Sequence, residues 1–187
     1  DLFGEVAFVA TTSAHGTELW LSDGTPAGTQ PVDIVPGPDS TFENPWLPAP
    51  FREDLGWIAI ESSAGLHVVD LDVGEQILLQ PSTGWGGIGV ATLGSGDGAR
   101  LLYWAYDDVE ACILRSSDGT PEDVVRLPNM APDGDIASLP GFGCDGGFAV
   151  AGSLGYYVSC DLATGCELWS TDGTLEGTQL FADFEPG

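Results

Sequence analysis

The 187-residue sequence predicts an all-β fold, a β-propeller-like array of about four four-stranded blades. Three observations lead to this prediction. A motif containing Asp-Gly-Thr recurs along the chain, and each copy lies among short apolar runs at matching offsets. In addition, 27 glycines and 13 prolines punctuate the sequence, and no stretch sustains a helical period. Together these features indicate many short strands joined by tight turns.

The motif occurs in two close copies and two divergent ones. "TELWLSDGTPAGTQ" (17–30) and "CELWSTDGTLEGTQ" (166–179) share three short blocks at the same offsets. The third copy is "ACILRSSDGTPEDVVRL" (111–127), and the most divergent is "GLHVVDLDVGEQILL" (65–79). The aligned aspartates Asp23, Asp70, Asp118 and Asp172 are separated by 47, 48 and 54 residues. Repeats of this length with four strands each are typical of propeller blades.

Each repeat offers the same succession of strands. An apolar run precedes each motif strand, at 5–12, 56–63, 99–106 and 154–161, and another follows the turn, at 29–35, 75–80, 122–127 and 178–184. A weaker upstream segment occurs at 45–51, 88–94 and 147–153. Near-continuous apolar runs such as "LLYWAY" suit sheets that are covered on both faces. A β-sandwich could use the same strands, but regular repetition of the whole unit favours a propeller.

The domain organisation expected is a single β-propeller segment over residues 1–187. Its approximate blades are 1–40, 41–86, 87–131 and 132–187. The first blade is expected to be incomplete, because the chain starts at "DLFGEVAFVA" without an upstream segment. This suggests a piece of a larger propeller or, less favoured, a partner that supplies the missing strand. "APDGDIASLPGFGCDGG" (131–147) reads as a loop insertion.

The repeated aspartate is predicted to serve a structural turn. Asp23 can accept hydrogen bonds from the backbone that follows it, as in an Asx turn, and Thr25 can cap the turn through its hydroxyl. Gly24 and Gly28 are expected to permit positive φ at the bend. Leu19 and Trp20 precede the turn on a strand and should pack between blades. The equivalent predicted turn residues are Asp118, Gly119, Thr120, Asp172, Gly173 and Thr174.

The charge of the chain restricts its partners. The formal net charge is −25, from 29 acidic residues against four arginines. Nucleic acid and anionic membranes are poor partners for such a surface, and no apolar run is long enough to span a bilayer. Ca²⁺ is a candidate cofactor, although the EF-hand pattern is absent. Its candidate ligands are Asp70 with Asp72 and Asp133 with Asp135.

The four cysteines are predicted to form disulfides. "CDLATGC" places Cys160 and Cys166 on either side of a short turn, where facing strands can bring them within bonding range. Cys112 and Cys144 form the second, weaker candidate pair. A metal site would more often show a Cys-x-x-Cys spacing or a neighbouring histidine. Disulfides imply an oxidising compartment, so we expect a secreted, cell-surface or periplasmic protein.

The motif resembles a known family. "GTELWLSDGTPAGTQPVDIVPG" (16–37) and "CELWSTDGTLEGTQLFADFEPG" (166–187) are similar to the ELWxxDGT repeats of secreted bacterial proteins. The third repeat keeps Ser-Asp-Gly-Thr but lacks the Trp, and in the second His67 stands where Trp is expected. The resemblance implies an extracellular propeller-like repeat protein. It brings no catalytic residues to this chain.

Catalytic patterns are weak. His15 is expected in an exposed turn and His67 in the core, and no Gly-x-Ser-x-Gly elbow occurs. The loops between the second and third strands of the repeats should share one rim of the propeller, where binding sites form. The candidate rim residues are His15, Asp107, Asp108, Glu110 and Asp161.

The sequence thus favours an extracellular non-enzymatic scaffold or binding module, which binds a surface protein or a glycan or forms a structural component of a surface assembly or filament. Further copies of the chain or other chains of a larger complex are the remaining expected partners. A propeller glycoside hydrolase with paired acids on the rim and a calcium-dependent adhesion module are the alternatives.

Overall fold

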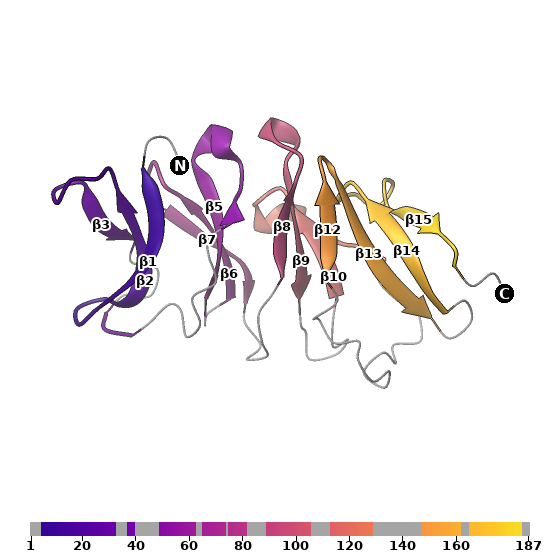
Figure 1. Ribbon diagram of the computed structural model, residues 1–187, viewed down its shortest axis with the longest axis horizontal. Helices are drawn as coiled ribbons and strands as arrows, with labels where there is room; N and C mark the ends of the chain where they lie inside the picture. The colour runs from indigo at the N-terminus through magenta and orange to yellow at the C-terminus, as the bar shows by residue number, and fades with distance from the viewer. Residues whose placement is uncertain are drawn as a thin grey trace. The chain divides into compact units, whose positions relative to one another are not determined.

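A computed structural model of the chain shows an all-β architecture (Figure 1). It describes residues 5–32, 37–39, 49–62, 65–73, 75–81, 89–105, 113–128, 147–161 and 165–184. Fifteen strands in these ranges form four antiparallel sheets, joined by turns and three single-turn 3₁₀ helices. The predicted fold class is therefore confirmed. In the described ranges no helix is long and apolar enough to cross a membrane.

The chain divides into two compact units, residues 1–84 and 85–187. The first unit holds two sheets whose strands follow chain order. The first sheet has three strands within the described residues. Its strands are β1 (Val6–Thr12), β2 (Gly16–Ser22) and β3 (Thr29–Val32); the second sheet contains β4 (Ala49–Pro50), β5 (Trp57–Ser62), β6 (Gly65–Asp70) and β7 (Glu75–Pro81), with η1 (Glu53–Leu55) between β4 and β5.

The second unit holds two four-stranded sheets, again in chain order. Their first strands arise in the weak upstream segments 88–94 and 147–153, as expected. The third sheet contains β8 (Val90–Leu93), β9 (Arg100–Ala105), β10 (Ile113–Ser117) and β11 (Val125–Arg126), with η2 (Gly96–Gly98) and η3 (Pro121–Asp123); the fourth contains β12 (Phe148–Ala151), β13 (Leu154–Asp161), β14 (Gly165–Thr171) and β15 (Gln179–Ala182).

The register gives every sheet two distinct faces. Side chains alternate along a strand, so consecutive motif residues point to opposite sides of the sheet. We call the side of the residue four positions before the motif aspartate the Leu face, because Leu19, Leu66, Leu114 and Leu168 occupy that position. The opposite side is the Trp face, with Trp20, His67, Arg115 and Trp169 one position later.

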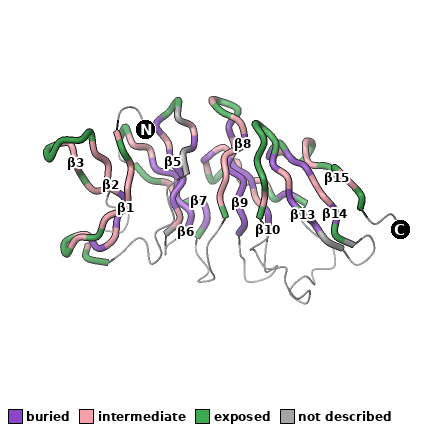
Figure 2. The backbone as a smooth tube through the Cα atoms, in the orientation of Figure 1, coloured by how far each residue is buried: buried purple, intermediate pink, exposed green. Residues whose placement is uncertain are grey.

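In the first unit, the Leu face of the first sheet packs on the Trp face of the second. Leu19 forms one cluster with Ile58, Ile60 and Val69, and Val9 and Val32 pack against it. Val9 is the register partner of Leu19 and therefore lies on the Leu face of the first sheet. Ile60 is the register partner of His67 and therefore lies on the Trp face of the second sheet. The apolar run of β5 and β6 is buried on both faces, as predicted (Figure 2).

The second unit repeats this packing. Leu102, Trp104, Leu114 and Leu127 of the third sheet form a cluster with Tyr157 of the fourth. Phe148 and Trp169 pack against it from the Trp face of the fourth sheet. The rings of Trp104 and Tyr157 meet edge to face, with centroids 6.5 Å apart. Leu-face-to-Trp-face packing is thus the common contact within both units.

Two buried tyrosines of the second unit should respond in opposite ways to loss of their hydroxyls. The Tyr157 hydroxyl donates a hydrogen bond to the Pro128 carbonyl. The Tyr103 hydroxyl is buried and has no partner among the described residues, and burial raises its pKa to about 12. We expect Tyr103→Phe to raise the free energy of unfolding by about 1 kcal/mol and Tyr157→Phe to lower it by a similar amount. Denaturant titration of both variants checks this. Equal destabilisation by both would contradict it.

Candidate functional site

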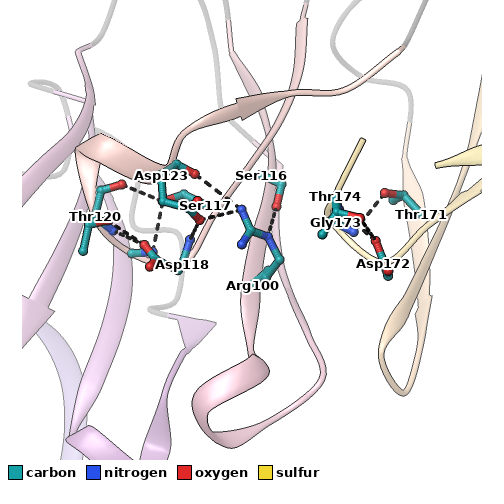
Figure 3. Close-up of polar contacts among 11 residues, drawn as sticks. Arg100, Ser116, Ser117, Asp118, Thr120, Asp123, Thr171, Asp172, Gly173 and Thr174 are labelled. Atoms are coloured by element: carbon teal, nitrogen blue, oxygen red, sulfur yellow. Dashed lines mark hydrogen bonds and ion pairs between the residues drawn. The ribbon is translucent and has the colours of Figure 1, made fainter. Parts of the chain in front are cut away.

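The motif aspartates are engaged by their own turns. Asp23 Oδ1 accepts hydrogen bonds from the Thr25 backbone N–H at 2.8 Å and from the Thr25 hydroxyl at 2.7 Å. These two hydrogen bonds lower the pKa of the Asp23 carboxyl, and the bond from the Thr25 hydroxyl has the larger effect. The corresponding distances are 2.9 and 2.7 Å for both Asp118 and Asp172 (Figure 3). One carboxylate oxygen of each is therefore committed to the backbone.

A hydroxyl before each aspartate completes the turn. Ser22, Ser117 and Thr171 each accept the backbone N–H two residues later, at 3.1, 3.0 and 2.9 Å. In the first and last repeats this hydroxyl also lies 2.7 Å from the hydroxyl of the second Gly-Thr pair. The sequence interpretation did not single out these residues. The available signal was a Ser or Thr directly before Asp in all three Asp-Gly-Thr copies.

The two glycines of the motif have different roles, and the expectation for the second was wrong. Gly24, Gly119 and Gly173 have φ of 89°, 104° and 91°, so they supply the left-handed bend. Gly28 is not among the positive-φ residues. Instead, a Cβ at Gly28 would lie 2.1 Å from Asp23 Oδ1, and one at Gly177 would lie 2.1 Å from Asp172 Oδ1. The second glycine is needed because the aspartate carboxylate occupies the space beside it.

The third repeat replaces that glycine with Asp123, and its turn is rebuilt. The Asp123 carboxylate accepts the Asp118 backbone N–H at 3.2 Å and pairs with Arg100 at 2.7 Å. Arg100 also donates from Nε to Ser116 Oγ at 2.8 Å (Figure 3). Arg100 lies at the start of β9, so this link joins the divergent turn to its own sheet. The guanidinium charge is largely balanced by Asp123.

The turns of the third and fourth repeats border an open depression of about 400 Å³. Six of its eight lining residues have polar side chains, namely three carboxylates, two hydroxyls and one guanidinium. The lining residues are Asp97, Gly98, Ala99, Arg100, Asp118, Ser153, Asp172 and Thr174. No histidine borders it, and Asp118 and Asp172 each hold their own turn. This arrangement can donate and accept hydrogen bonds, and the Asp172 carboxylate accepts the Thr174 hydroxyl at 2.7 Å as part of its own turn.

The calcium candidates divide into described and undescribed residues. Asp70 Oδ1 accepts the backbone N–H groups of Asp72 and Val73 at 2.9 and 3.2 Å, and Oδ2 accepts Trp57 Nε1–H at 2.9 Å. Both oxygens of Asp70 therefore serve the fold. Within the described part of the chain, no three His, Cys, Asp or Glu residues are grouped so that they could hold a metal ion. Asp133 and Asp135 lie outside the described residues.

The two histidines occupy unequal environments. His67 is 6% exposed, as expected for a core residue. His15, expected to be exposed, is half-buried, and its ring meets Trp20 edge to face with centroids 6.4 Å apart. The Thr12 hydroxyl accepts the His15 backbone N–H at 3.1 Å, which stabilises the turn itself. The edge-to-face contact with the Trp20 indole explains why His15 is less exposed than expected.

His67 should make stability depend on pH. Burial lowers its pKa below the ordinary value of 6.5, so the unfolded chain binds a proton that the folded chain resists. Stability is therefore full above about pH 6.5 and falls as the pH drops through the folded pKa. We expect wild type to lose more stability than His67→Phe between pH 7.5 and 5.5, measured by urea unfolding. A constant difference between the two proteins would contradict this.

The remaining predicted site residues are placed only in part. Asp161 ends β13, opposite Gly165 in the register. Asp107, Asp108 and Glu110 lie outside the described residues. Cys160 and Cys166 are register partners on β13 and β14, and Cys166 is disulfide-bonded. Cys112 and Cys144 also lie outside the described residues.

The glutamate of the motif was missed by the sequence interpretation. Glu18 and Glu167 are buried, with 0% and 3% exposure. Glu167 Oε2 accepts the backbone N–H of Phe184 at 2.5 Å, so it holds the chain just after β15. Repetition of Glu at the same offset in both close copies was the available signal. This role is structural and ties the motif strand to the end of the blade.

Comparison with known proteins bears on the architecture. No protein-family model matches the chain, and no curated protein matches it by sequence. Among solved structures it is similar to puromycin hydrolase, with 17% identity and a TM-score of 0.52 over 94% of this chain and 26% of that chain. The fold is that of β-propeller blades. A variant of the same hydrolase complexed with PGG is also similar, with 17% identity and a TM-score of 0.51. The match covers 98% of this chain and 27% of that chain.

TolB from Acinetobacter baumannii also matches, at 17% identity and a TM-score of 0.45, over 98% of this chain and 54% of that chain. The chain thus spans about a quarter of the hydrolase and about half of TolB. At this identity the likeness shows the fold alone.

Proposed function

We propose that this chain is a non-enzymatic, extracellular propeller segment that acts as a scaffold and binding module. The observation that carries the proposal is the use of the motif carboxylates. Asp23, Asp118 and Asp172 each bind their own turn through the same oxygen, so the repeated feature builds the fold. Binding then falls to surfaces that differ between blades. The depression beside Asp118 and Asp172 is such a surface.

The lining of this depression favours a hydroxyl-rich or basic ligand. Carboxylates and hydroxyls surround it, and the Arg100 charge is balanced by Asp123. A surface glycan or a basic segment of a surface protein provides complementary groups. Nucleic acid and anionic membranes remain excluded from the proposal, because the net charge of −25 would repel them.

An array of glycans and surface peptides probed with the intact chain tests this function. We expect a ligand whose binding is lost in Ser153→Trp, which fills the depression, and kept in Ser13→Trp, a control in an exposed turn of the first sheet. Equal ligand binding by the Ser153→Trp and Ser13→Trp variants would show that the depression is not the binding site. Hydrolysis of a glycan or peptide by the purified wild type would overturn its non-enzymatic part.

The proposed compartment depends on the cysteines. Cys160 lies directly opposite Cys166, which is disulfide-bonded, and we propose that these two residues form the bond. The Cys112–Cys144 bond is a proposal from sequence alone. Peptide mass mapping of the non-reduced protein tests both pairs. A Cys160–Cys166 linked peptide is expected. Four alkylatable thiols in protein isolated under native conditions would contradict the extracellular assignment.

A further inference from the structure

In the first and third repeats, the same motif positions form the contact between the two sheets of each unit. Two positions of the repeat lie on the Leu face. One is four residues before the motif aspartate, and the other is nine residues after that aspartate. The pairs are Leu19 and Val32, Leu66 and Leu79, Leu114 and Leu127, and Leu168 and Phe181. In the first unit Leu19 and Val32 pack on the second sheet. In the second unit Leu114 and Leu127 pack on the fourth.

The fourth sheet leaves these positions uncovered. Leu19, Leu66 and Leu114 are all 0% exposed, whereas Leu168 is only half-buried. Phe181 is 59% exposed, and Val158, the register partner of Leu168, is 49% exposed. Tyr156 meets Phe181 edge to face with centroids 5.2 Å apart, which orders the two rings on this face. This surface therefore carries the residues of an inter-sheet contact, and no sheet among the described residues covers them.

The first sheet carries the complementary surface. Its Trp face presents the register pair Phe8 and Trp20, both half-buried, and Val6, which is 59% exposed. Phe8 and Trp20 match Tyr157 and Trp169 of the fourth sheet, the register pair that packs on the Leu face of the third. One chain thus presents both halves of a contact that its two units each form once. A second copy of the chain is consequently a chemically matched occupant.

We propose that the Leu face of the fourth sheet docks the Trp face of the first sheet in a second copy of this chain. The contact joins different surfaces of the two copies, so it is heterologous and generates rings or open arrays. It deepens the proposed scaffold function, yet it can fail without affecting ligand binding at the depression. Because each copy has a net charge of −25 and the contact is apolar, association should strengthen with salt.

Sedimentation equilibrium of the intact chain tests the proposal. We expect the average mass of wild type to exceed 19.4 kDa and to rise with protein and salt concentration. Phe181→Glu and Val6→Glu, each on an exposed position, should both remain at 19.4 kDa. An equimolar mixture of these two variants should reach twice that mass and no more, because it retains one intact contact. Leu175→Glu adds the same charge at an exposed turn residue and should behave as wild type.

Three results would overturn the proposal. One is a wild type that stays monomeric at high protein and salt concentrations. Another is continued association of Val6→Glu, which indicates a symmetric contact between two Leu faces. The third is a mixture of the two variants that remains monomeric. Circular dichroism of each variant confirms folding, and Phe181→Ser replaces Phe181→Glu if the charged side chain disturbs the sheet.

Discussion

Gly177→Ala is expected to lower the free energy of unfolding by about 3 kcal/mol. The added Cβ would lie 2.1 Å from Asp172 Oδ1, a separation that no real structure tolerates. Asp172 must then move and release the Thr174 backbone N–H and hydroxyl, now held at 2.9 and 2.7 Å. Gly177 does not have a positive φ, so alanine adds no left-handed strain. The whole cost comes from the contact with the carboxylate.

A double-variant cycle isolates that contact. In an Asp172→Ala background the carboxylate is absent, and Gly177→Ala should then cost little or even stabilise by restricting the unfolded chain. Gly28→Ala should reproduce the full cost in the first sheet, because its Cβ would also meet Asp23 Oδ1 at 2.1 Å. Denaturant unfolding provides the measurement. An equal cost of Gly177→Ala with and without Asp172 would show that the carboxylate is not the cause.

The strand arrangement could be predicted because local signals and global packing agree. The segments 88–94 and 147–153 are weakly apolar, yet their positions in the repeat predicted strands, and β8 and β12 form there. "LLYWAY" predicted cover on both faces, and residues 101–105 are all buried. Repetition supplied the missing information, since four imperfect copies constrain a unit that no single copy defines.

The roles of individual side chains depended on distances that no spacing reveals. Gly28 looks like a second bend residue in the sequence, and only its approach to the Asp23 carboxylate shows why it is glycine. Asp123 looks like a lost glycine, but it accepts the Asp118 N–H and pairs with an arginine 23 positions earlier. The depression requires turns from two sheets to meet, so its lining could not be predicted from either repeat alone.

The second large effect concerns Gly173, where two costs combine. Its φ of 91° is left-handed, which costs an alanine about 1 kcal/mol. Its added Cβ would also lie 2.7 Å from Arg100 Cδ and 2.8 Å from Ser116 Oγ. Neither group can yield easily, because Arg100 Nε donates to Ser116 Oγ at 2.8 Å and its guanidinium pairs with Asp123 (Figure 3). Overpacking of this kind adds about 2 kcal/mol.

Gly24 provides the matched control for that prediction. It occupies the same position of the motif with a φ of 89°, but a Cβ there would meet nothing within 4 Å. Gly24→Ala should therefore cost about 1 kcal/mol and Gly173→Ala about 3 kcal/mol in urea unfolding. In an Arg100→Ala background the cost of Gly173→Ala should fall toward that of Gly24→Ala. Equal costs of the two alanines in the wild-type background would contradict this prediction. Such a result would show that Gly173 does not lie close to Arg100 of the third sheet.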